Sequence, residues 1–322
     1  MLSVVIPAFN EQEMVPAAAG QIDGILSRAG IPHELIFIDD GSRDATWAEI
    51  RAESEHRDTV RGVHFSRNFR KEAAIFAGLQ AADGDCVAVI DCDLQHPPET
   101  VVEMYRQWQA GYEVVEGVKH SRGRESFGHK ASAGLFYKMM TKATGIDMSR
   151  ASDFKLLDQR AVAALLDMPE RNAFFRALSS WVGFETTSVE FDVQPREAGE
   201  SKWSTWSLVK YAVTNIAAFS SVPLQMVTVA GAFMFIFAVV MAIESLVRYF
   251  GGHALEGFTT VILLLLIIGS LVMMSLGIIG YYISKIYEEV KGRPRYIISR
   301  TAGKKNKTLQ VPKSCYNEKE IE

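Results

Sequence analysis

The sequence contains little cysteine and has no marked excess of charge of either sign. Its 322 residues include 3 cysteines, Cys86, Cys92 and Cys315, whose spacing matches no metal site. So few cysteines suit a reducing cytoplasm. The formal net charge of −4 gives no support for nucleic-acid binding, so we expect no nucleic-acid partner.

Charged residues are absent from two long segments, Leu224 to Ile243 and Phe258 to Ser284. A helix needs roughly 20 apolar residues to cross a bilayer, and a charge at its centre costs about 2.5–3.5 kcal/mol. The pattern therefore predicts transmembrane helices over 223–250 and 258–284. The alternative is a pair of buried core helices, although core helices are rarely apolar on every side.

The short connection 251–257 has no Lys or Arg, whereas the segment 285–322 is basic. Because cytoplasmic flanks carry the excess of Lys and Arg, we expect a hairpin in the cell membrane with both termini and the catalytic domain in the cytoplasm. The chain opens on a strand-like run without a basic region before it, so we expect no signal peptide.

Residues 1–200 alternate β-rich apolar runs with helical segments, which predicts an α/β domain with a mostly parallel, Rossmann-like sheet. Ligands of such sheets bind at the carboxyl ends of the strands. Polar residues follow the expected strands at 10–11, 39–40, 67–68 and 91–95, so we expect one active site there. We expect strands over Leu2–Ala8, Glu34–Asp39, Val60–Phe65 and Val87–Asp91, and helices over Met14–Ala29, Asp44–Ser54, Glu72–Ala82 and from Pro98.

Residues 201–222 combine tryptophans with aliphatic residues just before the first apolar segment. We expect an amphipathic helix lying at the membrane interface. The alternative is an ordinary surface helix packed on the domain. A polar, glycine-containing stretch at 118–130 is interpreted as a loop over the site.

Two carboxylates, Asp91 and Asp93, stand one residue apart after an apolar run. They can converge on one hard divalent cation, which also takes phosphate oxygens. An isolated Asp-x-Asp is a weak signal and is often a solvated loop. The longer string 91–99, Asp-Cys-Asp-Leu-Gln-His-Pro-Pro-Glu, is far more specific.

This string resembles the metal-binding signature of family 2 glycosyltransferases, in particular the branch that uses polyprenyl phosphates. That branch includes dolichol-phosphate mannose synthases and bactoprenol glucosyltransferases. The resemblance implies a GT-A type nucleotide-sugar-binding domain and, because the family forms tetramers, a homo-oligomer. Matching stretches occur in order at 5–11, 39–42, 67–72, 152–158, 196–203, 280–283 and 293–296.

The resemblance also implies roles for the matching positions. Pro7, Glu11, Asp39 and Asp40 would line the nucleotide pocket, where a carboxylate can bind the base or the ribose. The alternative for 39–42 is a plain turn and helix cap. Lys71 and Glu72 belong to a matching stretch, and the first turn of a helix would also explain them.

Asp91 and Asp93, with Gln95, would hold Mg²⁺ or Mn²⁺ against the diphosphate of the donor. The chain departs from the family pattern at two positions. Cys92 replaces a small residue between the carboxylates, and we expect it to point away from the metal. Arg70 stands where glycine is common.

The charge that develops on the leaving diphosphate is neutralised by a divalent cation, which makes Asp93 important for catalysis. A lipid phosphate with a second pKa of about 6 is largely a dianion and needs little help from a base. We therefore expect Asp153, the family's candidate base, to orient the acceptor or to tune the field around the metal. The alternative is a structural carboxylate.

Cations near the expected interface suit an acceptor phosphate, because Arg offers bidentate hydrogen bonds and Lys a point charge. Arg196, Ser201 and Lys202 are the main candidates, with attraction to anionic headgroups as the alternative. Arg122 and Arg124 are further candidates that a solvated loop would explain equally well.

The leading hypothesis is inverting transfer of a hexose from a UDP-sugar, first UDP-glucose and second UDP-N-acetylglucosamine, to undecaprenyl phosphate for glycosylation of the cell envelope. A processive polysaccharide synthase would need more membrane helices and a Gln-x-x-Arg-Trp motif, which the sequence lacks. A non-catalytic membrane scaffold is the third reading. Dinucleotide oxidoreduction is disfavoured because no Gly-x-Gly-x-x-Gly follows the first strand.

The metal assignment predicts the behaviour of Asp93→Ala. Radiolabelled sugar transfer into membrane lipid should require Mg²⁺ or Mn²⁺ and should be lost in this variant, because one of the two carboxylate ligands is gone. Unchanged activity in Asp93→Ala would contradict the assignment.

Overall fold

The computed structural model describes residues 1–119, 152–168, 170, 174–192, 222–251 and 258–304. The chain divides into two compact units. The first comprises Met1–Trp203 together with Pro294–Glu322, and the second comprises Ser204–Arg293. The expected interfacial helix at 201–222 falls almost entirely outside the described residues.

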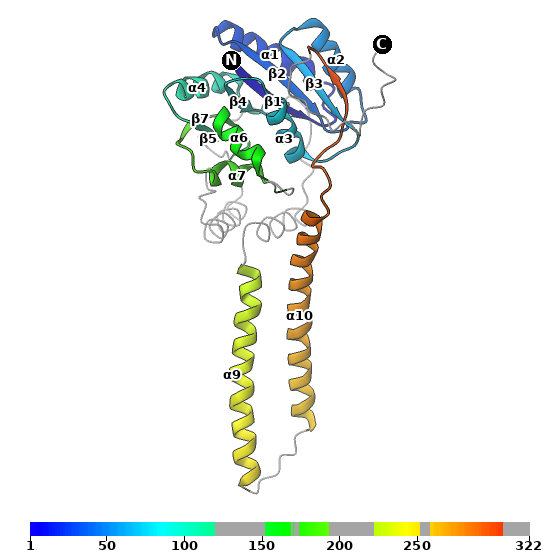
Figure 1. The fold of residues 1–322 in the computed structure, drawn as a ribbon, viewed down its shortest axis with the longest axis vertical. Helices are drawn as coiled ribbons and strands as arrows, with labels where there is room; N and C mark the ends of the chain where they lie inside the picture. Colours follow the sequence, from blue (N-terminus) through cyan, green and yellow to red (C-terminus); the bar gives the residue numbers. More distant parts are fainter. Residues whose placement is uncertain (120–151, 169, 171–173, 193–221, 252–257, 305–322) are drawn as a thin grey trace. The chain divides into compact units, whose positions relative to one another are not determined.

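The first unit is built on an eight-stranded sheet of order β7-β5-β6-β4-β1-β2-β3-β8 (Figure 1). Strands β4, β1, β2 and β3 run parallel to one another, and β7 runs parallel to β5. Strand β6 is antiparallel to β4 and β5, and β8 is antiparallel to β3. The mostly parallel sheet is confirmed. The strands are β1 Leu2–Ala8, β2 His33–Asp39, β3 Val60–Phe65, β4 Cys86–Val89, β5 Val114–Lys119, β6 Lys155–Asp158, β7 Thr186–Phe191 and β8 Ile298–Ala302.

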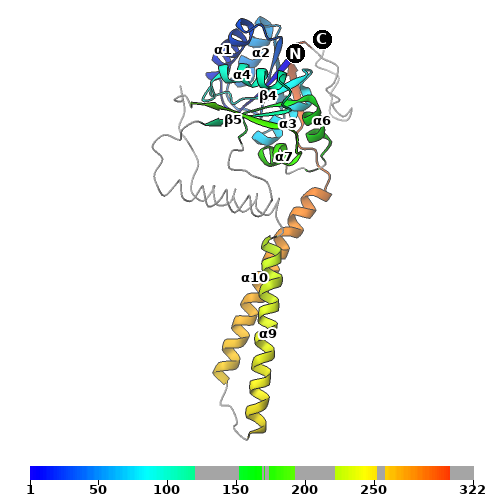
Figure 2. The same cartoon turned by 90° about the vertical axis from the view of Figure 1, so that its left-hand side faces the viewer.

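Helices cover both faces of this sheet (Figure 2). The central strands β1, β2 and β4 are consequently almost wholly buried, which explains why they read as continuous apolar runs. One face carries α1 Met14–Arg28, α2 Thr46–His56 and α4 Pro98–Gln109, and the other carries α3 Lys71–Ala81, α6 Gln159–Asp167 and α7 Phe175–Trp181.

Several element boundaries differ from the expected ones by one or two residues, and two of them lie next to the candidate site. Strand β4 ends at Val89 and not at Asp91, so both carboxylates lie in the loop that follows it, where Leu94 has a φ of 53°. Helix α3 starts at Lys71, directly after Arg70, whose φ of 78° is incompatible with a helix. Pro98 opens α4, where its missing N–H costs nothing.

The edge strand β8 lies within the segment 285–322, which the sequence analysis assigned to a basic tail. Its exposed polar residues give no alternating apolar pattern, so the sequence does not signal a strand. Just before it, the Tyr296 ring stacks on Phe65 at 5.1 Å between centroids. The Arg295 guanidinium lies 4.6 Å from the centre of the Phe76 ring and donates to backbone carbonyls. These contacts attach the C-terminal segment to the first unit.

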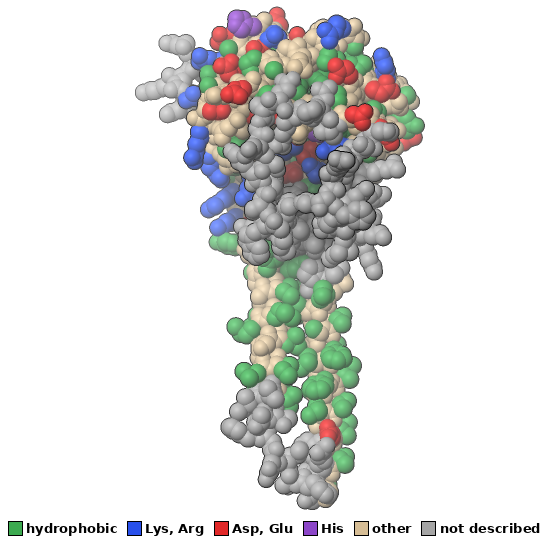
Figure 3. All heavy atoms as spheres, turned by 180° about the vertical axis from the view of Figure 1, so that it is seen from behind, with side chains coloured by type: hydrophobic (Ala, Val, Ile, Leu, Met, Phe, Trp, Pro, Cys, Tyr) green, Lys and Arg blue, Asp and Glu red, His purple; other side chains and the backbone are tan. Residues whose placement is uncertain are grey.

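The second unit consists of α9 Val222–Phe250 and α10 Phe258–Val290, which lie side by side (Figure 1). Each contains an apolar stretch long enough to cross a membrane, Leu224–Met241 and Leu264–Val290. Neither stretch is buried within the structure, which disfavours the alternative of core helices. Figure 3 shows hydrophobic side chains exposed along both helices. Exposed apolar surface of this extent indicates association with a membrane.

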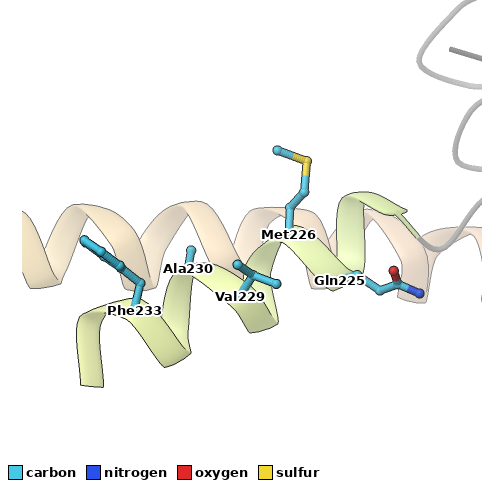
Figure 4. A pocket seen from close by; sticks show the side chains of 5 residues that line it. All are labelled: Gln225, Met226, Val229, Ala230 and Phe233. Atoms are coloured by element: carbon cyan, nitrogen blue, oxygen red, sulfur yellow. The ribbon is translucent and has the colours of Figure 1, made fainter. Parts of the chain in front are cut away.

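A shallow groove of about 490 Å³ lies on α9 (Figure 4). Met226, Val229, Ala230 and Phe233 line it together with the amide of Gln225. This lining offers no charged group for a diphosphate or a metal ion, so the groove does not suit the predicted chemistry.

The contact between Tyr296 and Phe65 predicts a graded loss of stability in two variants. Tyr296→Ala removes the stacked ring and should lower the free energy of unfolding by about 2 kcal/mol. Tyr296→Phe keeps the ring and loses only the hydroxyl bond to Gln80, so it should cost about 1 kcal/mol or less. Thermal unfolding of the detergent-purified protein tests both variants. Equal midpoints for Tyr296→Ala and wild type would show that the stacked ring does not stabilise the fold.

Candidate active site

The loops after β1, β2 and β3 meet at the carboxyl edge of the sheet, as the parallel order requires. The backbone N–H of Asn10 donates to Ser42 Oγ at 2.9 Å, and its side-chain Oδ1 accepts from the N–H of Arg43 at 3.0 Å. The N–H of Phe69 donates to Asp40 Oδ1 at 2.6 Å. Polar residues that are distant in the sequence thus form one connected surface.

Backbone strain collects in these same loops. Among the described residues, the non-glycine positions with positive φ are Asn10, Arg70 and Leu94, which follow β1, β3 and β4. Such strain costs on the order of 1–3 kcal/mol per residue and clusters at functional sites. Arg70 therefore stands where the backbone favours glycine, which explains why the family pattern has glycine there. Gly41, with a φ of 67°, allows the Arg67 backbone to approach so closely that a Cβ would lie 2.4 Å from its carbonyl carbon.

The two carboxylates after β2 have different surroundings. Asp39 is fully buried, and its oxygens accept from the Ser42 N–H at 2.9 Å and contact His64 Nδ1 at 2.7 Å. This pairing favours the turn-and-cap alternative for Asp39. Asp40 accepts from Phe69, and burial raises its pKa to about 6.

The other predicted donor-binding residues lie at the same edge. Pro7 is in β1, paired in register with Ile38 of β2. Glu11 follows β1, and its backbone N–H donates to Thr46 Oγ1 at 2.9 Å. Both are thus held beside the loop that carries Asp40.

Asp91 and Asp93 lie in the loop after β4, with Cys92 buried between them. Asp91 Oδ1 is 2.6 Å from Lys71 Nζ, and Asp93 Oδ1 accepts from the Gln95 N–H at 3.2 Å. Cys92 belongs to the buried core, and burial raises the pKa of its thiol, which stays neutral.

These oxygen ligands suit a hard divalent cation that is also coordinated by phosphate oxygens. No group of three or more His, Cys, Asp or Glu side chains that could hold a metal occurs among the described residues. Two carboxylates and an amide oxygen, from Asp91, Asp93 and Gln95, are nevertheless the kind of incomplete oxygen set that Mg²⁺ completes with water and substrate oxygens. These residues therefore suit the predicted ion when the diphosphate of a nucleotide sugar completes its coordination.

His96 holds the acidic loop against the core. Its ring stacks on Phe154 with centroids 4.7 Å apart and meets Phe191 edge-on. Burial lowers the pKa of His96, so the ring is neutral. Phe154 directly follows Asp153, so the stacking connects the acidic loop with the segment that carries Asp153.

Asp153 is buried and paired with two cations. Arg176 binds it in a bidentate manner, with Nε at 2.6 Å from Oδ1 and a terminal nitrogen at 2.7 Å from Oδ2. Lys71 Nζ lies 3.0 Å from Oδ2. Burial opposes ionisation, but the bonds from Arg176 and the charge of Lys71 hold the pKa of Asp153 well below its usual range. So acidic a carboxyl is a poor proton acceptor, which agrees with an orienting role.

Lys71 and Glu72 form the first turn of α3, as the sequence interpretation allowed, and they also make side-chain contacts with distant segments. Lys71 bridges Asp91 and Asp153, whereas Glu72 Oε2 accepts from the Phe175 N–H at 2.9 Å at the start of α7. The sequence does place Lys71 in a matching stretch, 67–72. Arg176 lies outside every matching stretch, so the sequence carried no signal for it.

A second buried ion pair contacts α7 through Ser179. Lys155 Nζ, fully buried, lies 3.0 Å from Glu116 Oε1 and donates to Ser179 Oγ at 2.6 Å. Burial lowers the pKa of Lys155, and Glu116 opposes this shift. Buried charges persist only with such partners. The pair joins β5, β6 and the helix that carries Arg176.

The predicted phosphate-binding residues Arg122, Arg124, Arg196, Ser201 and Lys202 lie outside the described residues. Their roles stay predictions.

Comparison with known proteins now identifies the family. The profile described as Glycosyl transferase family 2 matches residues 3–166, about half of the chain. The chain belongs to glycosyltransferase family 2. It is accordingly an enzyme that transfers a sugar, as the acidic loop and the mostly parallel sheet predict.

Relatives of this family 2 enzyme match it over nearly its whole length. The SfII prophage-derived bactoprenol glucosyl transferase of Shigella flexneri is 36% identical, with 93% of this chain and 98% of the relative covered. A prophage bactoprenol glucosyl transferase homolog of Escherichia coli is 34% identical over the same shares. An uncharacterized glycosyltransferase of Bacillus subtilis is 36% identical, covering 95% and 96%.

Among solved structures, glucosyl-3-phosphoglycerate synthase from Mycobacterium tuberculosis in complex with Mg²⁺ and uridine-diphosphate is similar to part of the chain. The sequence identity is 19% and the TM-score 0.48, with 67% of this chain and 77% of that chain covered.

Glu72 predicts a pH dependence of stability. Burial and the nearby charge of Asp153 raise its pKa from 4.5 to about 7. Between these values the folded protein binds a proton that the unfolded chain releases, so stability falls as the pH rises through this window. Glu72→Gln keeps an acceptor for Phe175 and removes the titration. The thermal unfolding midpoint of Glu72→Gln minus that of wild type should therefore increase by about 2–4 °C or more from pH 5 to pH 8.

The matched control is Glu55→Gln, because Glu55 is exposed on α2. The difference between this control and wild type should not change with pH. A constant difference for Glu72→Gln as well would contradict the raised pKa of Glu72.

Proposed function

We propose that this enzyme transfers a hexose from a UDP-sugar to undecaprenyl phosphate, with inversion at the anomeric carbon. UDP-glucose is the first candidate donor and UDP-N-acetylglucosamine the second. The product would be a polyprenyl-phosphate sugar used to glycosylate the cell envelope. One observation carries the proposal: relatives named bactoprenol glucosyl transferases match the chain over more than nine-tenths of both lengths.

The proposed reaction forms a bond between an acceptor phosphate oxygen and the anomeric carbon as the bond to UDP breaks. Asp91, Asp93 and Gln95 would hold Mg²⁺ or Mn²⁺, which supplies positive charge where the leaving diphosphate becomes more negative. Pro7, Glu11 and Asp40 would position the nucleoside, because they share the strand edge with the acidic loop.

No strong base is needed in this proposal. A phosphate monoester with a second pKa of about 6 is mostly dianionic at neutral pH and attacks without losing a proton. Asp153, held ionised by two cations, would fix the positions of Arg176 and Lys71 beside the donor. For the acceptor phosphate we propose Arg196, Ser201 and Lys202, with Arg122 and Arg124 closing from the loop.

The location follows from the two helices and the charges that flank them. We propose that α9 and α10 cross the cell membrane as a hairpin and that both termini and the catalytic domain are cytoplasmic, because Lys and Arg follow α10 and are absent from 251–257. We further propose a homo-oligomer. Gly269, Gly277 and Gly280 of α10 have open space beside them, so another helix can approach closely.

A donor panel tests the proposed function. Purified enzyme is incubated with undecaprenyl phosphate, Mg²⁺ and each of several nucleotide sugars, and the lipid is analysed by mass spectrometry. We expect one added hexose per lipid with UDP-glucose and at least about tenfold less product with donors of other nucleotides. If UDP-N-acetylglucosamine is the donor that gives product and UDP-glucose gives none, the second candidate donor is the correct one.

The same experiment distinguishes the other functions. A ladder of several sugars per lipid would favour a processive synthase. Donor binding without turnover, across all donors and several lipid acceptors, would favour a non-catalytic scaffold.

A further inference from the structure

Lys71 lies where a positive charge is shared between two acidic segments. Its Nζ is 2.6 Å from Asp91 Oδ1 and 3.0 Å from Asp153 Oδ2. The Lys71 side chain is 41% exposed, whereas that of Asp153 is 8% exposed. The ammonium therefore links the two acidic segments from the first residue of α3.

Arg176 alone compensates the charge of Asp153, so Asp153 does not depend on Lys71 for a counter-charge. Both of its oxygens accept from Arg176, at 2.6 Å and 2.7 Å. Asp91 is different, because Lys71 is its ion-pair partner among the described residues. Asp91 is also one of the two carboxylates assigned to the metal. The charge of Lys71 thus stands close to the position that a divalent cation would take.

We propose that Lys71 is the internal counter-cation of the metal site, bound to Asp91 until a divalent ion and the donor diphosphate arrive together. The inference rests on the proposed function only in taking Asp91 and Asp93 as metal ligands. When both arrive, the ammonium turns from Asp91 to the oxygens of the diphosphate, and Asp153 stays paired with Arg176.

Elementary electrostatics supports this exchange. Like charges a few ångströms apart in a partly buried site repel strongly, so a divalent ion binds poorly while Lys71 stays at Asp91. A diphosphate brings negative charge and gives the ammonium a new partner. Lys suits this role because it is a point charge on a flexible stem, whereas the planar Arg176 is fixed by its bidentate bond. Metal and nucleotide binding are then coupled, and the coupling is reciprocal.

The experiment measures binding of Mn²⁺ to the full chain in detergent, from the electron paramagnetic resonance signal of free Mn²⁺, with and without UDP. In wild type, UDP should tighten Mn²⁺ binding by about tenfold or more. Lys71→Met keeps the length of the side chain without its charge, so Mn²⁺ should bind about tenfold more tightly in the absence of UDP. The enhancement by UDP should shrink correspondingly.

Three further variants serve as controls. Lys71→Arg keeps the charge and should bind Mn²⁺ as wild type does within about threefold. Lys304→Met removes an exposed lysine paired with Asp58, and should leave Mn²⁺ binding unchanged. Lys71→Met combined with Asp91→Asn should lose the gain in affinity, because the carboxylate that was released is no longer present.

The proposal is overturned if Lys71→Met, with an unfolding midpoint like that of wild type, binds Mn²⁺ no more tightly. It is also overturned if the gain survives Asp91→Asn. Neither readout contains a sugar or a lipid, so a different donor or acceptor in the mass spectrometry would leave the result intact. Conversely, failure of the Lys71 prediction would leave the donor and acceptor assignments standing.

Discussion

Charge matching around the buried Asp153 is the constraint on which the active-site end of the molecule depends. A buried carboxylate without partners is costly, and here it draws Lys71 of α3 and Arg176 of α7 to one point. Lys71 in turn contacts the acidic loop after β4 through Asp91. These ion pairs thereby connect two helices and the loop after β4. The Lys155–Glu116 pair beneath α7 supports the same arrangement.

The sequence predicted those parts of the fold whose signal is local. Buried parallel strands read as apolar runs, and the acidic string 91–99 followed one of them, so the sheet and the site edge could be expected. The family resemblance supplied roles for Asp91 and Asp93. The sequence showed that Arg70 stands where the family pattern has glycine. The structure explains the preference for glycine, because the backbone has a positive φ at this position.

The remaining features depend on contacts between distant segments. Nothing near Arg176 in the sequence indicates that it would clamp Asp153, and nothing near Asp39 indicates that His64 would occupy one of its oxygens. Strand β8 was not predicted, because an exposed edge strand of mostly polar residues shows no alternation of apolar and polar residues. Such features arise from tertiary packing, which a single sequence encodes only through residues far apart.

The antiparallel pairing of β8 with β3 makes the catalytic unit discontinuous in the chain. The apolar hairpin is in effect an insertion between the main body of this unit and its last strand. A gene cut before α9 would therefore leave β3 as an open edge and expose the ring face of Phe65 that Tyr296 covers. A soluble catalytic fragment calls for a linker in place of the hairpin, so that residues 294–304 are retained.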